Sequence, residues 1–125
     1  LLYQHQLIVL CQMNNEKETC MTDYKAKFRI GQIVRHKLFD YTGVIFDIDP
    51  IFQSSDEWYK QVARSRPPKN KPWYYVLVHA AEHTTYVAEQ NLDFEENPKA
   101  IQHPLASSLF SKFDGVQYYL KSRTN

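Results

Sequence analysis

The chain has 125 residues, a formal net charge of +1 and 43% hydrophobic residues. This length fits a single domain, because two independent cores would each be too small to bury enough surface. A net charge this close to zero argues against a dedicated non-specific DNA binder, so any nucleic-acid role must rest on a local basic patch. No apolar run approaches the ~18 residues that a membrane-spanning helix needs.

The N-terminal stretch differs from the rest of the chain. Cys11 and Cys20 are the only cysteines, and no further Cys or His stands at zinc-ligand spacing from them, so we expect no disulfide framework, no metal and a reduced, cytoplasmic setting. The apolar run at residues 7–11 is too short for a signal peptide. We expect residues 1–23 to be a flexible extension, either native or read from upstream of a start at Met21, and residues 24–125 to form the domain.

The first predicted strand covers residues 32–38 and follows a lead-in at residues 27–30. Gly31 supplies the turn between the two. Residues 37–43 read as a hairpin connection, in which Gly43 is available for a positive φ.

A second strand is predicted for residues 44–49, and Pro50 ends it because proline cannot donate to a ladder. Alternation divides this strand into two faces. One face carries Val44, Phe46 and Ile48, and the other carries Ile45, Asp47 and Asp49. We interpret the second face as the solvent face of an antiparallel strand, so its carboxylates, with Glu89 nearby, are not taken as a catalytic or metal-binding pair.

A long irregular insertion occupies residues 51–72. Ser55 or Asp56 is suited to cap a short helical turn over residues 55–62, whereas three prolines keep residues 66–72 extended. Residues 73–79 then read as a strong central strand, residues 80–83 as a turn and residues 84–88 as the next strand. Residues 89–92 are typical of the single 3₁₀ turn before a last barrel strand.

The C-terminal region predicts a short helix and a final strand. Pro104 stands at a first-turn position and Gly115 after the end, and the apolar stripe between them consists of Leu105, Leu109, Phe110 and Phe113. Residues 116–120 are expected to be extended, and residues 121–125 form a polar tail.

A basic run bordered by aromatic residues in the longest loop is the strongest candidate site. Cations beside stacking faces suit phosphates and bases. The candidate DNA-binding residues are Lys60, Arg64, Arg66, Lys69, Lys71, Trp58 and Tyr59. The alternative interpretation is a solvated loop that its charges keep soluble.

No pattern in the chain indicates catalysis. No Ser or Cys lies in a nucleophile elbow, and neither a Gly-rich phosphate loop nor a His-Glu-x-x-His motif occurs. His79 and His83 flank one turn and are interpreted as polar turn residues. We therefore predict a protein that is not an enzyme and has no cofactor.

Four motifs follow one another in order: Phe28-x-Ile30-Gly31-Gln32-x-Val34-Arg35-His36, Gly43-Val44-x-x-Asp47-Ile48-Asp49-Pro50, Pro72-Trp73-Tyr74, and Thr85-Tyr86-Val87-Ala88-Glu89-x-Asn91-Leu92. Together they resemble the YccV-like, or hemimethylated DNA-binding, family of the bacterial heat shock protein HspQ, across residues 24–125. The resemblance implies a mainly all-β fold without a catalytic centre. The expected architecture is an SH3-like, partly open small β-barrel with a long loop insertion and a short C-terminal helix.

The resemblance also implies two activities. One is an adaptor that promotes degradation of denatured proteins, including the replication initiator, by a Lon-type ATP-dependent protease; tethering and strand addition at an open barrel edge are its physical means. The other is recognition of hemimethylated origin DNA, with Trp58 or Tyr59 sensing the methyl group.

A third possibility is a plain protein-interaction barrel that reads methylated cations. It requires that three or more of a set of four aromatic residues converge on one open pocket: Trp58, Trp73, Tyr74 and Tyr86. We also expect self-association that covers exposed edges, as a trimer in preference to a dimer.

Overall fold

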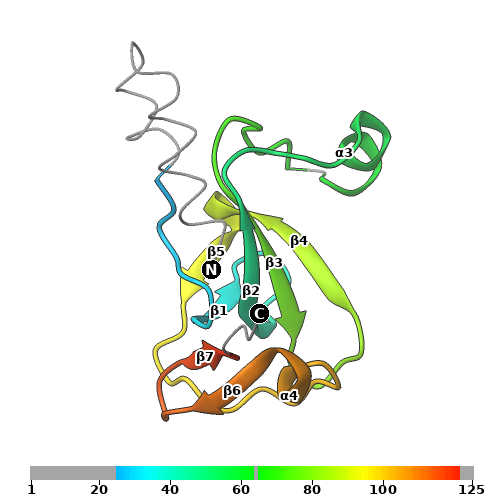
Figure 1. The fold of residues 1–125 in the computed structure, drawn as a ribbon. Helices are drawn as coiled ribbons and strands as arrows, with labels where there is room; N and C mark the ends of the chain where they lie inside the picture. The colour runs from blue at the N-terminus through cyan, green and yellow to red at the C-terminus, as the bar shows by residue number, and fades with distance from the viewer. Residues whose placement is uncertain (1–24, 64, 122–125) are drawn as a thin grey trace.

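The computed structural model describes residues 25–63 and 65–121. The predicted N-terminal extension, both cysteines and Arg64 lie outside the described residues. Among the described residues, strands form two antiparallel sheets, one large and one small, and a short helix stands off the large sheet on a long loop (Figure 1). No helix in this part of the chain is long and apolar enough to cross a membrane.

The larger sheet contains five strands: β1 (Ile33–His36), β2 (Thr42–Asp49), β3 (Trp73–Val78), β4 (Thr84–Ala88) and β5 (Leu92–Phe94). They pair antiparallel in the order β4-β3-β2-β1-β5, so the sheet stays open and β4 and β5 form its two edges. A 3₁₀ turn, η1 (Glu89–Asn91), joins these edge strands. The predicted small, mainly β and incompletely closed fold is confirmed, as are the 3₁₀ turn and the strands expected at residues 32–38, 44–49, 73–79 and 84–88, although β1 ends earlier than predicted, at His36, and β2 begins earlier, at Thr42.

The second sheet is a hairpin of β6 (Phe110–Phe113) and β7 (Tyr118–Leu120), preceded by α4 (Ala106–Leu109). The prediction of one helical stripe reaching Phe113 was wrong, because the helix ends at Leu109. The turn after β6 explains the change: the Asp114 carboxylate accepts hydrogen bonds from Val116 N at 2.8 Å and Gln117 N at 2.9 Å, and Gly115 takes a φ of 97°. This turn favours a hairpin over a longer helix.

A β-bulge in β2 changes the faces that strict alternation assigns. Ile45 pairs with Val76 and Asp47 with Tyr75, so Phe46 is an extra residue in the ladder. The bulge places Ile45 and Ile48 together in the same core cluster. The predicted grouping of Ile45 with Asp47 was therefore wrong.

Asp49 does not lie on a solvent face either, because only 5% of its surface is exposed. The prediction that Gly43 takes a positive φ in the hairpin connection was also wrong. Gly43 lies inside β2 without a positive φ, and the turn before it places that conformation at Asp40 instead, with a φ of 57°. A Cβ at Gly43 would collide with the backbone oxygen of Leu77. Gly43 is therefore needed for the close approach of β2 and β3.

The main core holds the lead-in segment against the sheet. Phe28 is fully buried, and the backbone N–H groups of Lys27 and Phe28 donate to the Tyr74 hydroxyl at 3.0 and 3.2 Å. That hydroxyl in turn donates to the Glu89 carboxylate at 2.6 Å. Burial, with the Glu89 hydrogen bond, raises the pKa of Tyr74 well above its usual range, so Tyr74 remains a neutral donor.

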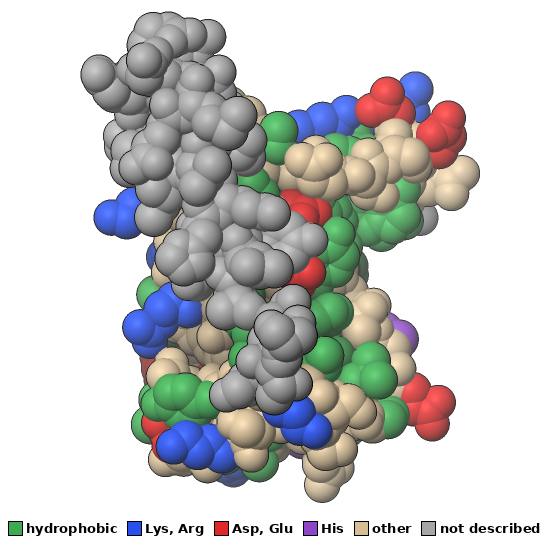
Figure 2. Space-filling model, in the orientation of Figure 1, with side chains coloured by type: hydrophobic (Ala, Val, Ile, Leu, Met, Phe, Trp, Pro, Cys, Tyr) green, Lys and Arg blue, Asp and Glu red, His purple; other side chains and the backbone are tan. Residues whose placement is uncertain are grey.

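The long loop carries α3 (Asp56–Val62), which confirms the predicted helical turn. The Ser55 hydroxyl accepts a hydrogen bond from Trp58 N at 3.1 Å and so caps the helix, as predicted. Trp58 and Tyr59 then pack on an outer cluster that contains Trp73 and Ala88. This contact positions α3 beside β4, and Figure 2 shows a hollow with hydrophobic walls between the lobe that carries α3 and the body of the domain.

Candidate functional site

Aromatic residues from β3, β4 and α3 form one packed group. Trp73 and Tyr86 stack with ring centroids 5.2 Å apart. The Trp58 ring meets both edge-on, at 6.0 Å from Trp73 and 5.6 Å from Tyr86. Because β3 and β4 are neighbours and α3 is held by its cap, these rings form a fixed wall.

A buried carboxylate fixes the base of this wall. The hydroxyls of Tyr75 and Tyr86 donate to one oxygen of Asp49 at 3.0 and 2.7 Å. The Tyr86 hydroxyl also accepts from Gln53 N at 3.0 Å. Burial, followed by the hydrogen bond to Asp49, raises the pKa of Tyr86, which keeps it a neutral donor. The two hydroxyls offset the desolvation of Asp49, so its role is structural.

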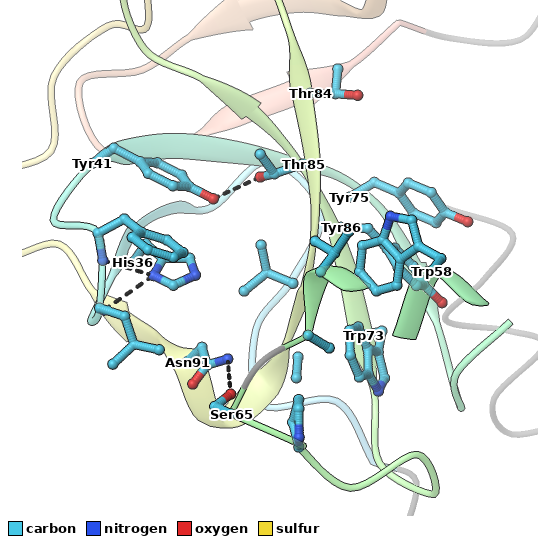
Figure 3. A pocket seen from close by; sticks show the side chains of 17 residues that line it. His36, Tyr41, Trp58, Ser65, Trp73, Tyr75, Thr84, Thr85, Tyr86 and Asn91 are labelled. Carbon is cyan, nitrogen blue, oxygen red and sulfur yellow. Dashed lines mark hydrogen bonds between the residues drawn. The ribbon is translucent and has the colours of Figure 1, made fainter. Parts of the chain in front are cut away.

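The wall borders an open cavity of about 440 Å³, which we name the β4 groove. It lies between the β1–β2 turn and α3, with β4 along its length (Figure 3). The residues that line it are His36, Leu38, Phe39, Tyr41, Trp58, Val62, Ala63, Ser65, Pro67, Trp73, Tyr75, Thr84, Thr85, Tyr86, Val87, Ala88 and Asn91.

Polar contacts hold the turn side of the β4 groove in place. The buried His36 ring accepts at Nδ1 from Leu38 N and Phe39 N, at 3.1 and 3.2 Å. Burial lowers the pKa of His36, which favours the neutral ring that this acceptor role requires. Tyr41 and Thr85 share a hydroxyl hydrogen bond of 2.7 Å that links this side to β4.

A second cavity, of about 340 Å³, is lined by four lysines from three separate parts of the chain: Lys25, Lys27, Lys37 and Lys71. We name it the lysine cleft. Its one acidic residue is Glu89, whose carboxylate accepts from the Tyr74 hydroxyl at 2.6 Å and from Lys27 N at 2.7 Å. Four positive charges and one negative charge give the lining a formal charge of +3. Ala88 lines both cavities, so the lysine cleft and the β4 groove adjoin.

The structure places the described residues of the predicted basic run in different surroundings, so they do not form one site. Lys69 forms an ion pair with Asp56 at 3.0 Å, and its ammonium lies 4.4 Å from the Tyr59 ring centroid. Arg66 also lies over that ring, and the Tyr59 hydroxyl donates to Pro67 O at 2.7 Å. These contacts hold the loop to α3.

The remaining predicted site residues that the structure describes do not gather at one site. Lys60 is exposed on α3, Trp58 lines the β4 groove, and Arg64 lies outside the described residues. Lys71 is the member of the run that lines the lysine cleft. Sequence reasoning missed Lys25, Lys27 and Lys37, for which the available signal was the Lys25-x-Lys27 spacing in an extended segment.

Three of the four aromatic residues that could form a pocket for methylated cations line the same cavity. Trp58, Trp73 and Tyr86 line the β4 groove, whereas Tyr74 is fully buried in the main core. The three rings contact one another instead of enclosing an empty space. They therefore offer an apolar wall to a ligand and not a cage around a cation.

No three His, Cys, Asp or Glu side chains within residues 25–63 and 65–121 stand together in a metal-binding arrangement. The two turn histidines have structural contacts instead. His79 Nδ1 accepts from Gln102 N at 3.0 Å, and the His83 carbonyl oxygen lies 3.0 Å from His103 Nε2. The residues brought together can bind by charge, apolar contact and backbone hydrogen bonds.

Residues 26–117 match the family model described as hemimethylated DNA-binding protein YccV like. The chain belongs to the YccV-like family. It is also similar to F-box only protein 21 from Pongo abelii and from Homo sapiens, each 33% identical over 93 residues, and from Mus musculus, 32% identical over 93 residues. These matches cover 73% of this chain, which spans only about 15% of the length of these curated relatives.

Proposed function

We propose that this YccV-like domain is a non-catalytic module that binds hemimethylated duplex DNA. The observation that carries the proposal is the convergence of four lysines in one cleft, in a chain whose family is described as hemimethylated DNA-binding. Lysine ammonium groups contact phosphates without reading sequence. A near-neutral chain can hold DNA in this way because its positive charge is gathered locally.

The number of lysines sets the expected salt dependence. If all four contact phosphates, counterion release gives a slope of roughly −3.6 for log K against log salt concentration. Affinity then falls about 150-fold between 50 and 200 mM salt. A smaller slope means that fewer lysines reach phosphates.

The neighbouring β4 groove offers a means of sensing the methyl group. A methyl group on adenine adds an apolar projection in the major groove. Trp58 presents an apolar surface in the cavity that shares Ala88 with the lysine cleft. Phosphate contacts in the lysine cleft would thus place the duplex beside an aromatic wall.

Fluorescence anisotropy with labelled duplexes, methylated on one strand, on both or on neither, tests this function. The variant Lys37→Gln/Lys71→Gln should bind more weakly and reduce the salt slope by about 1.8. The control Lys99→Gln/Lys121→Gln alters two exposed lysines that do not line the cleft and should leave both quantities unchanged. The absence of salt-sensitive binding refutes the proposal, and equal affinity for the three duplexes refutes its hemimethylated specificity.

The adaptor role is the second candidate, and the open edge of the large sheet at β4 favours it. Such an adaptor would act in the cytoplasm, deliver denatured proteins, including the replication initiator, to a Lon-type protease, and self-associate as a trimer. Degradation of a denatured client by purified protease should accelerate when the protein is added. An unchanged rate refutes the adaptor role, and light scattering that gives a monomer mass refutes the trimer.

A further inference from the structure

The outer edge of β4 presents unused strand-pairing groups. Glu89 N donates to Pro72 O at 3.1 Å and Val78 N to His83 O at 3.5 Å, which sets the phase of the β3–β4 ladder. In an antiparallel ladder, inward and outward residues alternate. The N–H and C=O of Thr84 and Tyr86 therefore point away from β3, and no described residue forms a hydrogen bond with them.

The β4 groove lies along this edge. All five residues of β4 line it, although neighbouring side chains of a strand point to opposite faces. A cavity that touches both faces in turn must follow the edge of the strand. The outward backbone groups of Thr84 and Tyr86 consequently face the groove.

The rim of the groove is apolar and accessible. Leu38, Phe39 and Val62 line it with 59%, 73% and 55% of their surfaces exposed. Exposed apolar side chains gathered around one cavity are typical of an interaction site. A polypeptide is the partner that supplies both backbone groups at strand spacing and an apolar side chain for this wall.

Charge distinguishes the two ends of β4. The Ala88 end adjoins the lysine cleft, whereas the Thr84 end follows the exposed Glu82. Acidic side chains are therefore attracted at the Ala88 end and repelled at the Thr84 end.

We propose that the β4 groove binds an extended, acid-flanked peptide as an added strand. An apolar side chain of the peptide packs against Trp58, and its acidic residues lie toward the lysine cleft. The peptide would use the Trp58 wall and the lysine cleft that the DNA proposal also uses, so peptide and duplex should compete for the domain. The inference rests on the adaptor proposal only for the class of peptide that an adaptor would hold.

The test is anisotropy with the fluorescein-labelled peptide Asp-Glu-Asp-Thr-Phe-Thr-Val and the same residues in reverse order. At least one of these two peptides should show saturable binding to the domain. Affinity should fall by about tenfold or more when Phe is replaced by Ala, when alternate peptide N–H groups are methylated, and when the acids are replaced by lysines. The methylated peptides remove strand pairing without altering the protein.

Val62→Asp places a charge in the groove at an exposed position of α3 and should weaken binding by about tenfold or more. Val116→Asp, at a similarly exposed position that does not line the groove, should have no effect. Circular dichroism checks that both variants fold. The proposal is overturned if neither peptide order binds, or if the affinity is unchanged by N–H methylation of the peptide or by Val62→Asp. These assays contain no protease, so their failure is separate from failure of the adaptor role.

Discussion

Replacing Asp47 with Asn should make the domain more stable at neutral pH. Asp47 lies on β2 beside the bulge, and its Oδ1 accepts from Ile48 N at 3.0 Å. Burial is the main cause that raises the pKa of its carboxyl to about 6; the Ile48 hydrogen bond opposes this increase, and the nearby charge of Asp49 adds to it. The ordinary value is 3.8.

Because the folded pKa lies above the unfolded one, the folded state holds this proton more tightly. The resulting stabilisation is present below pH 3.8 and is lost as the pH rises through about 6. A shift of about two units corresponds to ~3 kcal/mol, and solvent around the half-buried carboxyl reduces this to ~1.5 kcal/mol. Asparagine keeps the acceptor for Ile48 N and carries no charge. The free energy of unfolding of Asp47→Asn should therefore exceed that of the wild type by ~1.5 kcal/mol at pH 7.5 and equal that of the wild type at pH 3.5.

Urea unfolding followed by tryptophan fluorescence between pH 3.5 and 8 measures this difference. Asp93→Asn is the matched control, because exposed Asp93 makes the same type of bond, from Phe94 N at 3.0 Å. It should show no gain at high pH. A difference for Asp47→Asn that is independent of pH, or a loss of stability at pH 7.5, would refute the electrostatic reasoning.

Three further substitutions test the packing. Gly43→Ala should destabilise the domain by about 1–3 kcal/mol in urea unfolding, because its Cβ meets the Leu77 backbone oxygen; unchanged stability would contradict the close approach of β2 and β3. Tyr118→Phe removes the hydroxyl that accepts from buried Ile101 N at 2.7 Å and should cost about 1–3 kcal/mol in thermal unfolding; no loss would mean that another group satisfies this N–H. Ser55→Ala should raise hydrogen exchange in α3, since losing a cap costs about 1 kcal/mol of helix stability; unchanged exchange would argue against the cap.

The strand and turn pattern was predictable because most of it is local. Gly31, Pro50 and the alternation of β3 and β4 mark boundaries that tertiary contacts did not change. The bulge at Phe46 was not predictable in this way, since one extra residue leaves composition unchanged and alters only the pairing with β3. The end of α4 was missed because an apolar spacing over Leu109–Phe113 fits both a helix and a strand.

The candidate site was predictable only in part because its charges come from distant segments. Lys71 belongs to the visible basic run, but Lys25 and Lys27 join it through the lead-in that Tyr74 and Glu89 hold. The Lys25-x-Lys27 spacing pairs these two lysines but does not indicate that they approach Lys71. The aromatic wall was easier to predict from the sequence, since Trp73 and Tyr86 lie on neighbouring predicted strands.

The most direct test of the account is an amide NMR titration of the isotopically labelled domain with a hemimethylated duplex. We predict that chemical-shift changes concentrate at Lys25, Lys27, Lys37 and Lys71 and fade as salt is raised from 50 to about 200 mM. Changes centred on β6 and β7, or a spectrum that the duplex leaves unaltered, would contradict the assignment of the lysine cleft as the DNA-binding site.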